Sequence, residues 1–174
     1  MGGLCEMSAK VPITDTRFRA VMGSIPTPVA VVSTFDGDRP HGTTVSAFMS
    51  LSIAPPMVVV SLDRSSDLLR HITESRRFAI NVLAAHQSAI AAAFAKKGTD
   101  KMQISDTAWH VDSGLPRIDE ASGWVACHVA SMVEGGDHII VLGHVAALDH
   151  LPVPPLVYHQ GTFGLHAPMA ENNG

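Results

Sequence analysis

The sequence predicts a mainly β protein whose strands run antiparallel and close into a barrel, with short helices inserted between them. About six or seven short runs of β-branched and other apolar residues recur along the chain. Most consecutive runs are separated by tight turns rich in Gly, Asp and Pro. Strands that are numerous, short and joined as hairpins favour an antiparallel barrel over a doubly wound parallel sheet.

The composition bounds the size of the protein and the kind of partner it can have. A chain of 174 residues is long enough for one domain with a substantial core. Its net charge of −4 leaves no basic patch for a phosphate backbone, so we expect no nucleic-acid partner. Few charges among many apolar residues indicate that some apolar surface is buried against another subunit.

The ends of the chain and its cysteines suggest a single domain in a reducing compartment. We expect residues 1–13 to be a flexible leader, 14–166 one domain and 167–174 a flexible tail. Cys5 and Cys127 have no CxxC or His-spaced neighbour, so neither a disulfide framework nor a zinc site is indicated. The histidines are scattered without HxH or HExxH spacing, and we expect no metal. Because no signal-peptide core or membrane-spanning run is present, we expect a cytoplasmic location.

The first part of the chain predicts a helix and then three strands. Thr14 or Asp15 can cap a short helix that Gly23 ends. The run 29–35 is dense in β-branched residues, which predicts a strand buried on both faces. The other elements predicted here are a turn at 36–38, the partner strand 41–48 and a third strand 57–62.

The second part predicts two more helices among further strands. The spacing of Leu68, Leu69 and Ile72 predicts a helix ending near Glu74, and the alanine-rich run 87–95 predicts another. Between 96 and 119 the periodicity fades, so we expect mostly loop with Trp109 as an anchor. The remaining predicted elements are strands 78–83, 121–134, 138–148 and 156–158, with a glycine turn at 135–137.

The stretch Gly42–Ser52 alternates hydroxyl and apolar side chains, and three interpretations compete for it. It could be an ordinary half-buried strand, it could carry a nucleophilic serine, or its hydroxyls and backbone N–H groups could face a polar-rimmed ligand. No G-x-S-x-G elbow surrounds any serine, which weakens the nucleophile interpretation of Ser46. Neither a G-x-G-x-x-G nor a Walker A pattern is present.

Three other short motifs carry possible chemistry, each with a structural alternative. Arg64-Ser65-Ser66 begins a predicted helix and could clamp a phosphate, although simple N-capping by either serine is the alternative. Lys96-Lys97 ends a helix, where cations also stabilise the helix C-terminus. His138 follows the glycine turn and is well placed to be exposed in a pocket. Together these motifs suit a phosphorylated aromatic ligand such as flavin mononucleotide.

The order of several segments carries a family resemblance that covers nearly everything from Phe18 to Leu165. The segments are 29–34 with the 36–37 turn, 44–52, 55–60, 62–66, 78–83, 94–95, 136–138 with Gly143, and 155–158 with Gly161. In this order they resemble the flavin reductase-like, FMN-binding split-barrel family. Its members are the small reductase components of two-component flavin-dependent monooxygenases.

The resemblance implies a homodimer of split β-barrels with FMN or FAD held near the dimer interface. It implies that the isoalloxazine edge lies against Thr44, Val45, Ser46 and Ala47, with Ser61 and Leu62 nearby. It places the ribityl phosphate region at Arg64, Ser65 and Ser66, and the phosphate or an FAD adenosine toward Phe94, Ala95 and Lys97. NADH or NADPH would be met by His138, the candidate catalytic residue, and by Tyr158.

The function that the resemblance implies is hydride transfer from NAD(P)H to FMN or FAD, with reduced flavin supplied to a partner monooxygenase. The hydride itself requires no acid or base, so we expect His138 to position the reactants. Three alternatives remain: a flavin- or haem-binding barrel without NAD(P)H turnover, a pyridoxamine-phosphate-oxidase-like enzyme, and a ligand-free interaction module. A yellow protein that does not oxidise NAD(P)H would indicate the flavin-binding barrel. A bound flavin that is reduced by an amine would indicate the oxidase-like enzyme, and a colourless protein would indicate the interaction module.

Overall fold

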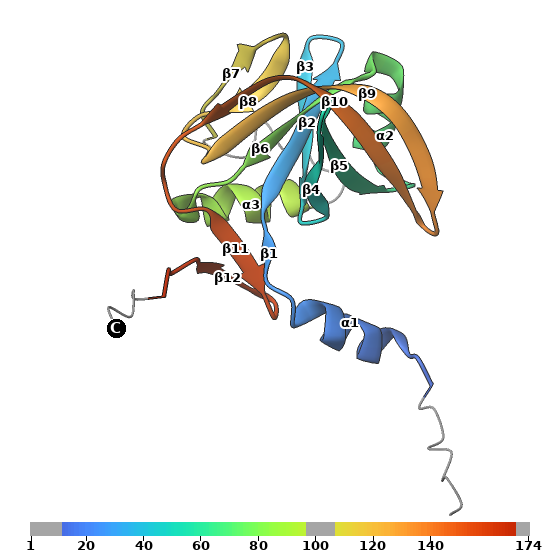
Figure 1. Cartoon of the computed structure of the whole chain (residues 1–174), viewed down its shortest axis with the longest axis vertical. Helices are drawn as coiled ribbons and strands as arrows, with labels where there is room; N and C mark the ends of the chain where they lie inside the picture. Colours follow the sequence, from blue (N-terminus) through green and yellow to red (C-terminus); the bar gives the residue numbers. More distant parts are fainter. Residues whose placement is uncertain (1–11, 97–106, 170–174) are drawn as a thin grey trace, which may run out of the picture.

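The computed structural model describes residues 12–96 and 107–169, and its largest element is a curled seven-stranded sheet (Figure 1). The strands follow the order β3-β2-β6-β9-β10-β5-β4, and all paired strands are antiparallel. The predicted antiparallel β architecture is confirmed. The strands of this sheet are β2 (Ala30–Asp36), β3 (Arg39–Val45), β4 (Phe48–Ile53), β5 (Pro56–Asp63), β6 (Arg77–Val82), β9 (Gly123–Gly135) and β10 (His138–His150).

The edges of this sheet, β3 and β4, are consecutive in the chain and are joined through Ser46 and Ala47. The backbone N–H of Ser61 donates to the Ala47 carbonyl at 2.9 Å, which ties this link to β5. The predicted partner strand over 41–48 is therefore confirmed as β3 up to Val45, where it pairs with β2, and wrong in its extension to Phe48. Val45 and Phe48 both pack on the core three positions apart, a spacing that one strand with a two-residue period cannot provide.

The predicted strand over 29–35 is confirmed as β2, and it is buried on both faces. Val32 packs into one core cluster with Phe78 and Val141, while Val31 packs into a second with Phe94. Its hairpin turn is the dipeptide Gly37-Asp38, with Gly37 at φ +59°. A positive φ is the conformation that glycine adopts without a steric penalty.

Two predicted helices cover the barrel. The helix α2 (Asp67–Ser75) buries Leu68, Leu69 and Ile72 against the first core cluster, as their spacing predicts. The helix α3 (Ser88–Ala95), after a short 3-10 turn η1 (Ala85–Gln87), buries Ala91 and Phe94 against the second cluster.

The expected loop at 96–119 is wrong in its second half, where β7 (Trp109–Asp112) and β8 (Leu115–Ile118) form a hairpin. The fully buried Asn81 of β6 holds this hairpin. Its amide oxygen accepts from the Ile118 N–H at 2.8 Å, and its amide nitrogen donates to the Ser33 hydroxyl at 3.0 Å. The hairpin is thus specified by a long-range contact rather than by local periodicity. Residues 97–106 lie outside the described ranges.

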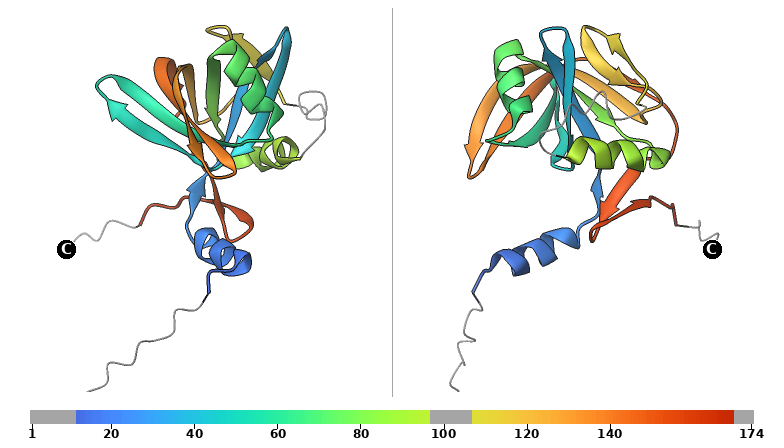
Figure 2. Two further views of the ribbon diagram at one scale, coloured as in Figure 1. Left: turned by 90° about the vertical axis from the view of Figure 1, so that its right-hand side faces the viewer. Right: turned by 180° about the vertical axis from the view of Figure 1, so that it is seen from behind.

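A second, three-stranded sheet lies beneath the barrel, with the order β1-β11-β12. It contains β1 (Thr27–Pro28), β11 (Leu156–His159) and β12 (Thr162–Leu165). The strand predicted at 156–158 is therefore present but is not the last one. Below this sheet α1 (Asp15–Gly23), capped by the Thr14 hydroxyl, extends away from the barrel in every view (Figure 2).

Among residues 12–96 and 107–169, no helix is both long enough and apolar enough to cross a membrane.

Candidate functional site

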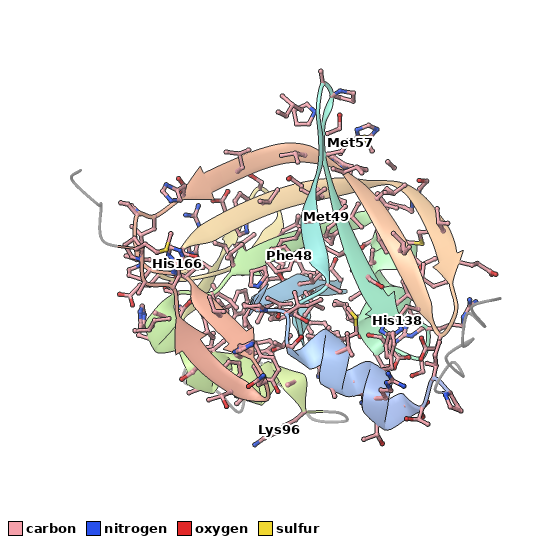
Figure 3. The ribbon with its side chains drawn as sticks, turned by 60° about the horizontal axis from the view of Figure 1, so that its bottom comes forward. Phe48, Met49, Met57, Lys96, His138 and His166 are labelled. Atoms are coloured by element: carbon pink, nitrogen blue, oxygen red, sulfur yellow. The ribbon has the colours of Figure 1, made fainter. Side chains whose placement is uncertain are left out.

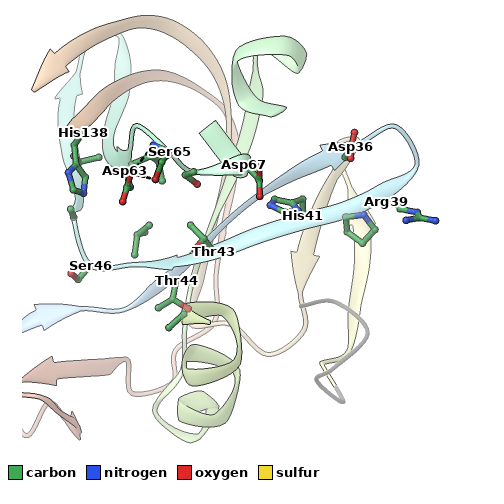
Figure 4. Close-up of a pocket in the computed structure, with 17 residues that line it drawn as sticks. Asp36, Arg39, His41, Thr43, Thr44, Ser46, Asp63, Ser65, Asp67 and His138 are labelled. Atoms are coloured by element: carbon green, nitrogen blue, oxygen red, sulfur yellow. Dashed lines mark hydrogen bonds between the residues drawn. The ribbon is translucent and has the colours of Figure 1, made fainter. Parts of the chain in front are cut away.

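A cleft of about 710 Å³ opens where the link between β3 and β4 meets the end of β5, the start of α2 and the start of β10 (Figure 4). It brings together ten of the residues predicted for ligand binding. They are Thr44, Val45, Ser46, Ala47, Ser61, Leu62, Ser65, Ser66, Ala95 and His138. Segments that are distant in the sequence meet here because β5 pairs with both β4 and β10.

The hydroxyl-bearing stretch presents its groups to the cleft in two different ways. The hydroxyls of Thr43 and Thr44 donate to the carbonyls of Phe94 and Ala91, at 3.3 and 2.7 Å, and so attach β3 to α3. Ser46 instead lies exposed at the break between β3 and β4. Of these three hydroxyl residues, Ser46 is therefore the one whose side chain is exposed at the cleft.

The start of α2 lines the cleft through Ser65, Ser66 and Asp67. Ser65 donates both its backbone N–H and its hydroxyl to one carboxylate oxygen of Asp63, at 2.8 and 2.7 Å. Ser66 occupies the N-cap position but makes no side-chain capping bond, so N-capping by Ser66 is wrong as an interpretation. The first turn of α2 thus has no hydroxyl cap from this residue, and its N–H groups carry the positive end of the helix dipole.

Arg64 belongs to the predicted phosphate clamp, but the structure does not bring its side chain into the cleft. Its guanidinium lies 3.4 Å from the Glu134 carboxylate and donates to the Gly136 carbonyl at 3.2 Å. Its backbone N–H also donates to the Asp137 carbonyl at 2.9 Å. Arg64 therefore holds the glycine turn that precedes His138.

His138 lines the cleft from the first position of β10. Its Nδ1 is 2.8 Å from the Asp137 carboxylate. The hydrogen bond from His138, with the charge of its ring, lowers the pKa of the Asp137 carboxyl below its ordinary value. In a neutral ring this contact places the proton on Nδ1 and the lone pair on Nε2, so His138 would accept rather than donate at Nε2.

Two other predicted binding residues, Phe94 and Tyr158, are not part of the cleft lining. Phe94 is fully buried in the second core cluster, where its ring packs beneath Gly42. Tyr158 lies in β11 of the smaller sheet, with its ring 5.3 Å from that of Phe163. Lys97 lies outside the described residues.

Sequence reasoning missed one end of the cleft, which is lined by Asp36, Arg39, Pro40 and His41. Asp36 and Arg39 flank the β2–β3 turn and face each other in the strand register. In the sequence, Asp36-Gly37-Asp38 indicates a turn and no more. A charged pair that flanks a two-residue turn is the signal that could have identified this end.

The site contains no evident metal centre in the ranges that the structure describes, since no group of three or more His, Cys, Asp or Glu side chains is arranged to hold an ion. The thiol of Cys127 is buried in the core, and burial raises its pKa to about 12. It is therefore a protonated core side chain rather than a nucleophile.

Comparisons with known proteins agree with this architecture. The chain is 35% identical over 157 residues to the reductase component of 4-nitrophenol 4-monooxygenase/4-nitrocatechol 2-monooxygenase of Rhodococcus opacus, covering 90% of this chain and 84% of that one. It is 33% identical over 165 residues to an NADH-dependent FAD reductase of Streptomyces globisporus, covering 92% and 90%.

Solved structures show the same similarity. Flavin reductase PheA2 superposes with a TM-score of 0.83 at 30% identity, covering 90% of this chain and all of that one. The NADH:FAD oxidoreductase SgcE6 of Streptomyces globisporus, in complex with NAD and FAD fragments, gives 0.84 at 30% identity, covering 92% and 100%. The model of the flavin reductase like domain matches residues 22–165, and the chain therefore belongs to the flavin reductase like domain family.

Proposed function

We propose that this chain is an NAD(P)H:flavin oxidoreductase that reduces FMN or FAD and supplies the reduced flavin to a partner monooxygenase. The observation that carries the proposal is the single cleft into which the family's segments bring Ser46, Ser61, Ser65 and His138. Curated relatives are named as reductase components of such monooxygenases. We place the reaction in the cytoplasm, consistent with the free thiol of Cys127.

The cleft suits a flavin in size and in the chemistry of its walls. Its volume of about 710 Å³ lies in the range of small-molecule sites. Ser46 and Ala47, at the break between two strands, would hold the polar edge of the ring. Ser65, Ser66 and the N-terminus of α2 would hold the phosphate, because helix N–H groups and the helix dipole favour an anion.

When bound, the flavin would supply the reactive ring, with its N5 as the acceptor of the hydride from C4 of NAD(P)H. The protein's part is to hold the two ligands at reacting distance and to exclude other orientations. Donors at the Ser46 edge would stabilise negative charge on the reduced ring. His138, fixed through Asp137 and the turn that Arg64 holds, would orient the nicotinamide through its Nε2 side.

The direct test is steady-state oxidation of NADH and NADPH by the purified chain with FMN, FAD or riboflavin. Turnover with at least one flavin is expected, and no turnover with any of the three would refute the reductase function. Transfer to the oxygenase is tested separately, by product formation when the reductase is mixed with a candidate oxygenase and its substrate.

Ser46 offers a finer test of how the flavin is held. Replacing Ser46 with Ala removes one hydrogen-bonding group, worth about 0.5–1.5 kcal/mol, so the KM for flavin should rise about two- to tenfold. The kcat at saturating flavin should change little, because the hydride step does not need the hydroxyl. Ser50→Ala, on the exposed part of β4, is the matched control. A Ser46→Ala enzyme that binds flavin normally but is inactive would contradict this role.

We also propose that the chain works as a homodimer, with α1 packed against the second subunit. This helix buries none of its residues, yet three apolar side chains, Phe18, Val21 and Met22, lie on it with spacings of three and four. Each is about half exposed or more, and so is Ile25, two residues beyond the end of the helix. The edge strand β4 adds exposed Met49, labelled in Figure 3, and the exposed Ile53 at its end. An isolated helix of this length is not stable in water without such burial.

The dimer is tested by measuring the molar mass in solution. The Phe18→Ser/Met22→Ser variant should shift the protein toward the monomer, because it removes the apolar stripe. Arg19→Ser, on the same helix, should leave the mass unchanged. A dimer that survives the double substitution would place the interface elsewhere.

A further inference from the structure

Two exposed histidines lie directly opposite each other on the outer face of the seven-stranded sheet. His144 of β10 pairs with His128 of β9 in the strand register. The next residues along the two strands, Val145 and Val129, pack on the first core cluster, so both imidazoles point away from the core. Opposite residues of antiparallel strands have Cβ atoms about 4.5–5.5 Å apart, and both rings can therefore reach one shared ligand.

Two one-residue bulges in the β9–β10 hairpin bring these histidines together. Ala130 is an extra residue on β9, and Ala146 is an extra residue on β10. Between the bulges the register is offset by one over three pairs, and the middle pair is His144 with His128. Without the offset, His144 would face Val129. Bulges re-aim side chains, and here they place two imidazoles side by side that no HxH or HExxH motif predicts.

Neither imidazole is occupied by another side chain. In the part of the chain that the structure describes, His128 and His144 have no hydrogen bond, ion pair or ring contact. Other histidines differ in this respect, since His86, His110 and His138 each lie against a carboxylate. The ring nitrogens of the opposed pair are therefore available to a ligand from solution.

The flanking strands add a thioether on one side of the pair and a cation on the other. Met57 of β5, half-buried and labelled in Figure 3, pairs with His144 in the register. Arg77 of β6 pairs with His128, but its guanidinium donates to the Ser113 carbonyl in the β7–β8 turn. This row of four residues thus offers two imidazoles and one thioether, and it contains no carboxylate.

These donors match copper in its reduced form. Imidazole suits copper and several other first-row metals, whereas the soft thioether selects Cu(I). Zinc sites are built instead from Cys, His, Asp and Glu side chains. The positive charge of Arg77 also opposes a doubly charged ion more strongly than a singly charged one. The row therefore favours a soft cation with a single charge.

We propose that His128, His144 and Met57 form a binding site for a Cu(I) ion on the outer face of the sheet. The histidines supply two nitrogen ligands, and Met57 supplies a sulfur ligand. The site is separate from the cleft, because His138 is six positions from His144 on β10, about 20 Å along an extended strand. Copper binding there needs neither flavin nor nicotinamide, so it is measured independently of the flavin reductase function.

The experiment is a competition for Cu(I) between the protein and the chelator bicinchoninate, with oxygen excluded. Thiolates also bind Cu(I), so every protein in the comparison carries Cys5→Ser, while Cys127 is buried in the core. The full-length Cys5→Ser protein, the parent in this comparison, should take up one equivalent of Cu(I).

Substitutions in the row identify the ligands. His128→Gln and His144→Gln should each weaken Cu(I) binding at least about tenfold, because even the loss of a group that only supports a metal ligand costs about 10–100-fold. Met57→Leu should weaken binding of Cu(I) more than binding of Zn(II), since it removes the soft ligand. His150→Gln removes another exposed histidine of β10 and should bind Cu(I) as the parent does.

Proton NMR shows whether one ion meets both rings. The imidazole signals of His128 and His144, assigned by their loss in the two variants, should shift together as one equivalent of Cu(I) is added. Copper binding that is unchanged in both Gln variants would overturn the proposal. So would a shift of only one of the two rings, or a parent protein that prefers Zn(II) to Cu(I).

Discussion

Gly143 on β10 is a position where the structure allows only glycine, and replacing it with Ala should destabilise the barrel. A Cβ atom at Gly143 would lie 2.6 Å from the Phe78 ring and 3.0 Å from the Cys127 Cβ. Carbon atoms in favourable contact are about 3.5–4.0 Å apart, so the ring would have to move by about 1 Å. Phe78 is fully buried in the main core cluster and has no free space to enter.

Overpacking of this kind costs about 1–3 kcal/mol. For a chain of this size each kcal/mol lowers the melting temperature by about 2–4 °C, so a drop of about 4–8 °C is expected for a cost of 2 kcal/mol. Calorimetry or thermal unfolding followed by circular dichroism measures it. Gly123→Ala on β9 is the matched control, because its new Cβ would meet Val82 at an ordinary 3.6 Å.

The reasoning is refuted if Gly143→Ala melts within about 1 °C of the wild type. A second variant checks the cause. Phe78→Leu removes the atoms that clash, so the double variant should lose less stability than the sum of the two single variants. Full additivity would mean that the ring is not the obstacle.

The remaining predictions concern Cys127, Arg117 and Asn81. In the Cys5→Ser variant, the folded protein should resist alkylation by iodoacetamide at pH 8, because burial raises the pKa of the Cys127 thiol to about 12. Rapid alkylation of Cys127 before the protein unfolds would contradict this. Arg117 donates to Asp112 and Asp149 at 2.8 and 2.5 Å and lowers the pKa of both carboxyls. That stabilisation is present above their ordinary pKa of about 4 and is lost as pH falls through the lowered values. The stability lost in Arg117→Met, measured in urea, should therefore shrink between about pH 5 and pH 2, and a constant difference would refute the pairing. Asn81→Leu should lower the free energy of unfolding by about 2–4 kcal/mol, because it leaves buried groups of the β7–β8 hairpin unpaired; an unchanged urea midpoint would exclude this role.

Much of the fold was predictable because its signals are local. The dense β-branched run of β2, the glycine turn between β9 and β10 and the helical spacing in α2 each depend on residues a few positions apart. The motif order also identified ten residues that now line one cleft.

Other features depend on partners that are far away in the sequence. The break at Ser46-Ala47 arises because Val45 and Phe48 must both reach the core while the chain changes partners from β2 to β5. Arg64 turns from the cleft because Glu134 and the Gly136 carbonyl are within reach. No local sequence pattern predicts the break at Ser46-Ala47 or the direction of the Arg64 side chain.

The sequence by itself determined the antiparallel β architecture, strand β2, helix α2 and the glycine turn before β10, because propensity and periodicity act over short distances. Only the tertiary structure decided which hydroxyl is exposed at the cleft, that Asn81 holds a hairpin, and that buried His71 contacts both Asp36 and His41. The physical reason is that hydrogen bonds and ring contacts join whichever groups the sheet brings within a few ångströms of each other, and the sheet order is set by the whole core.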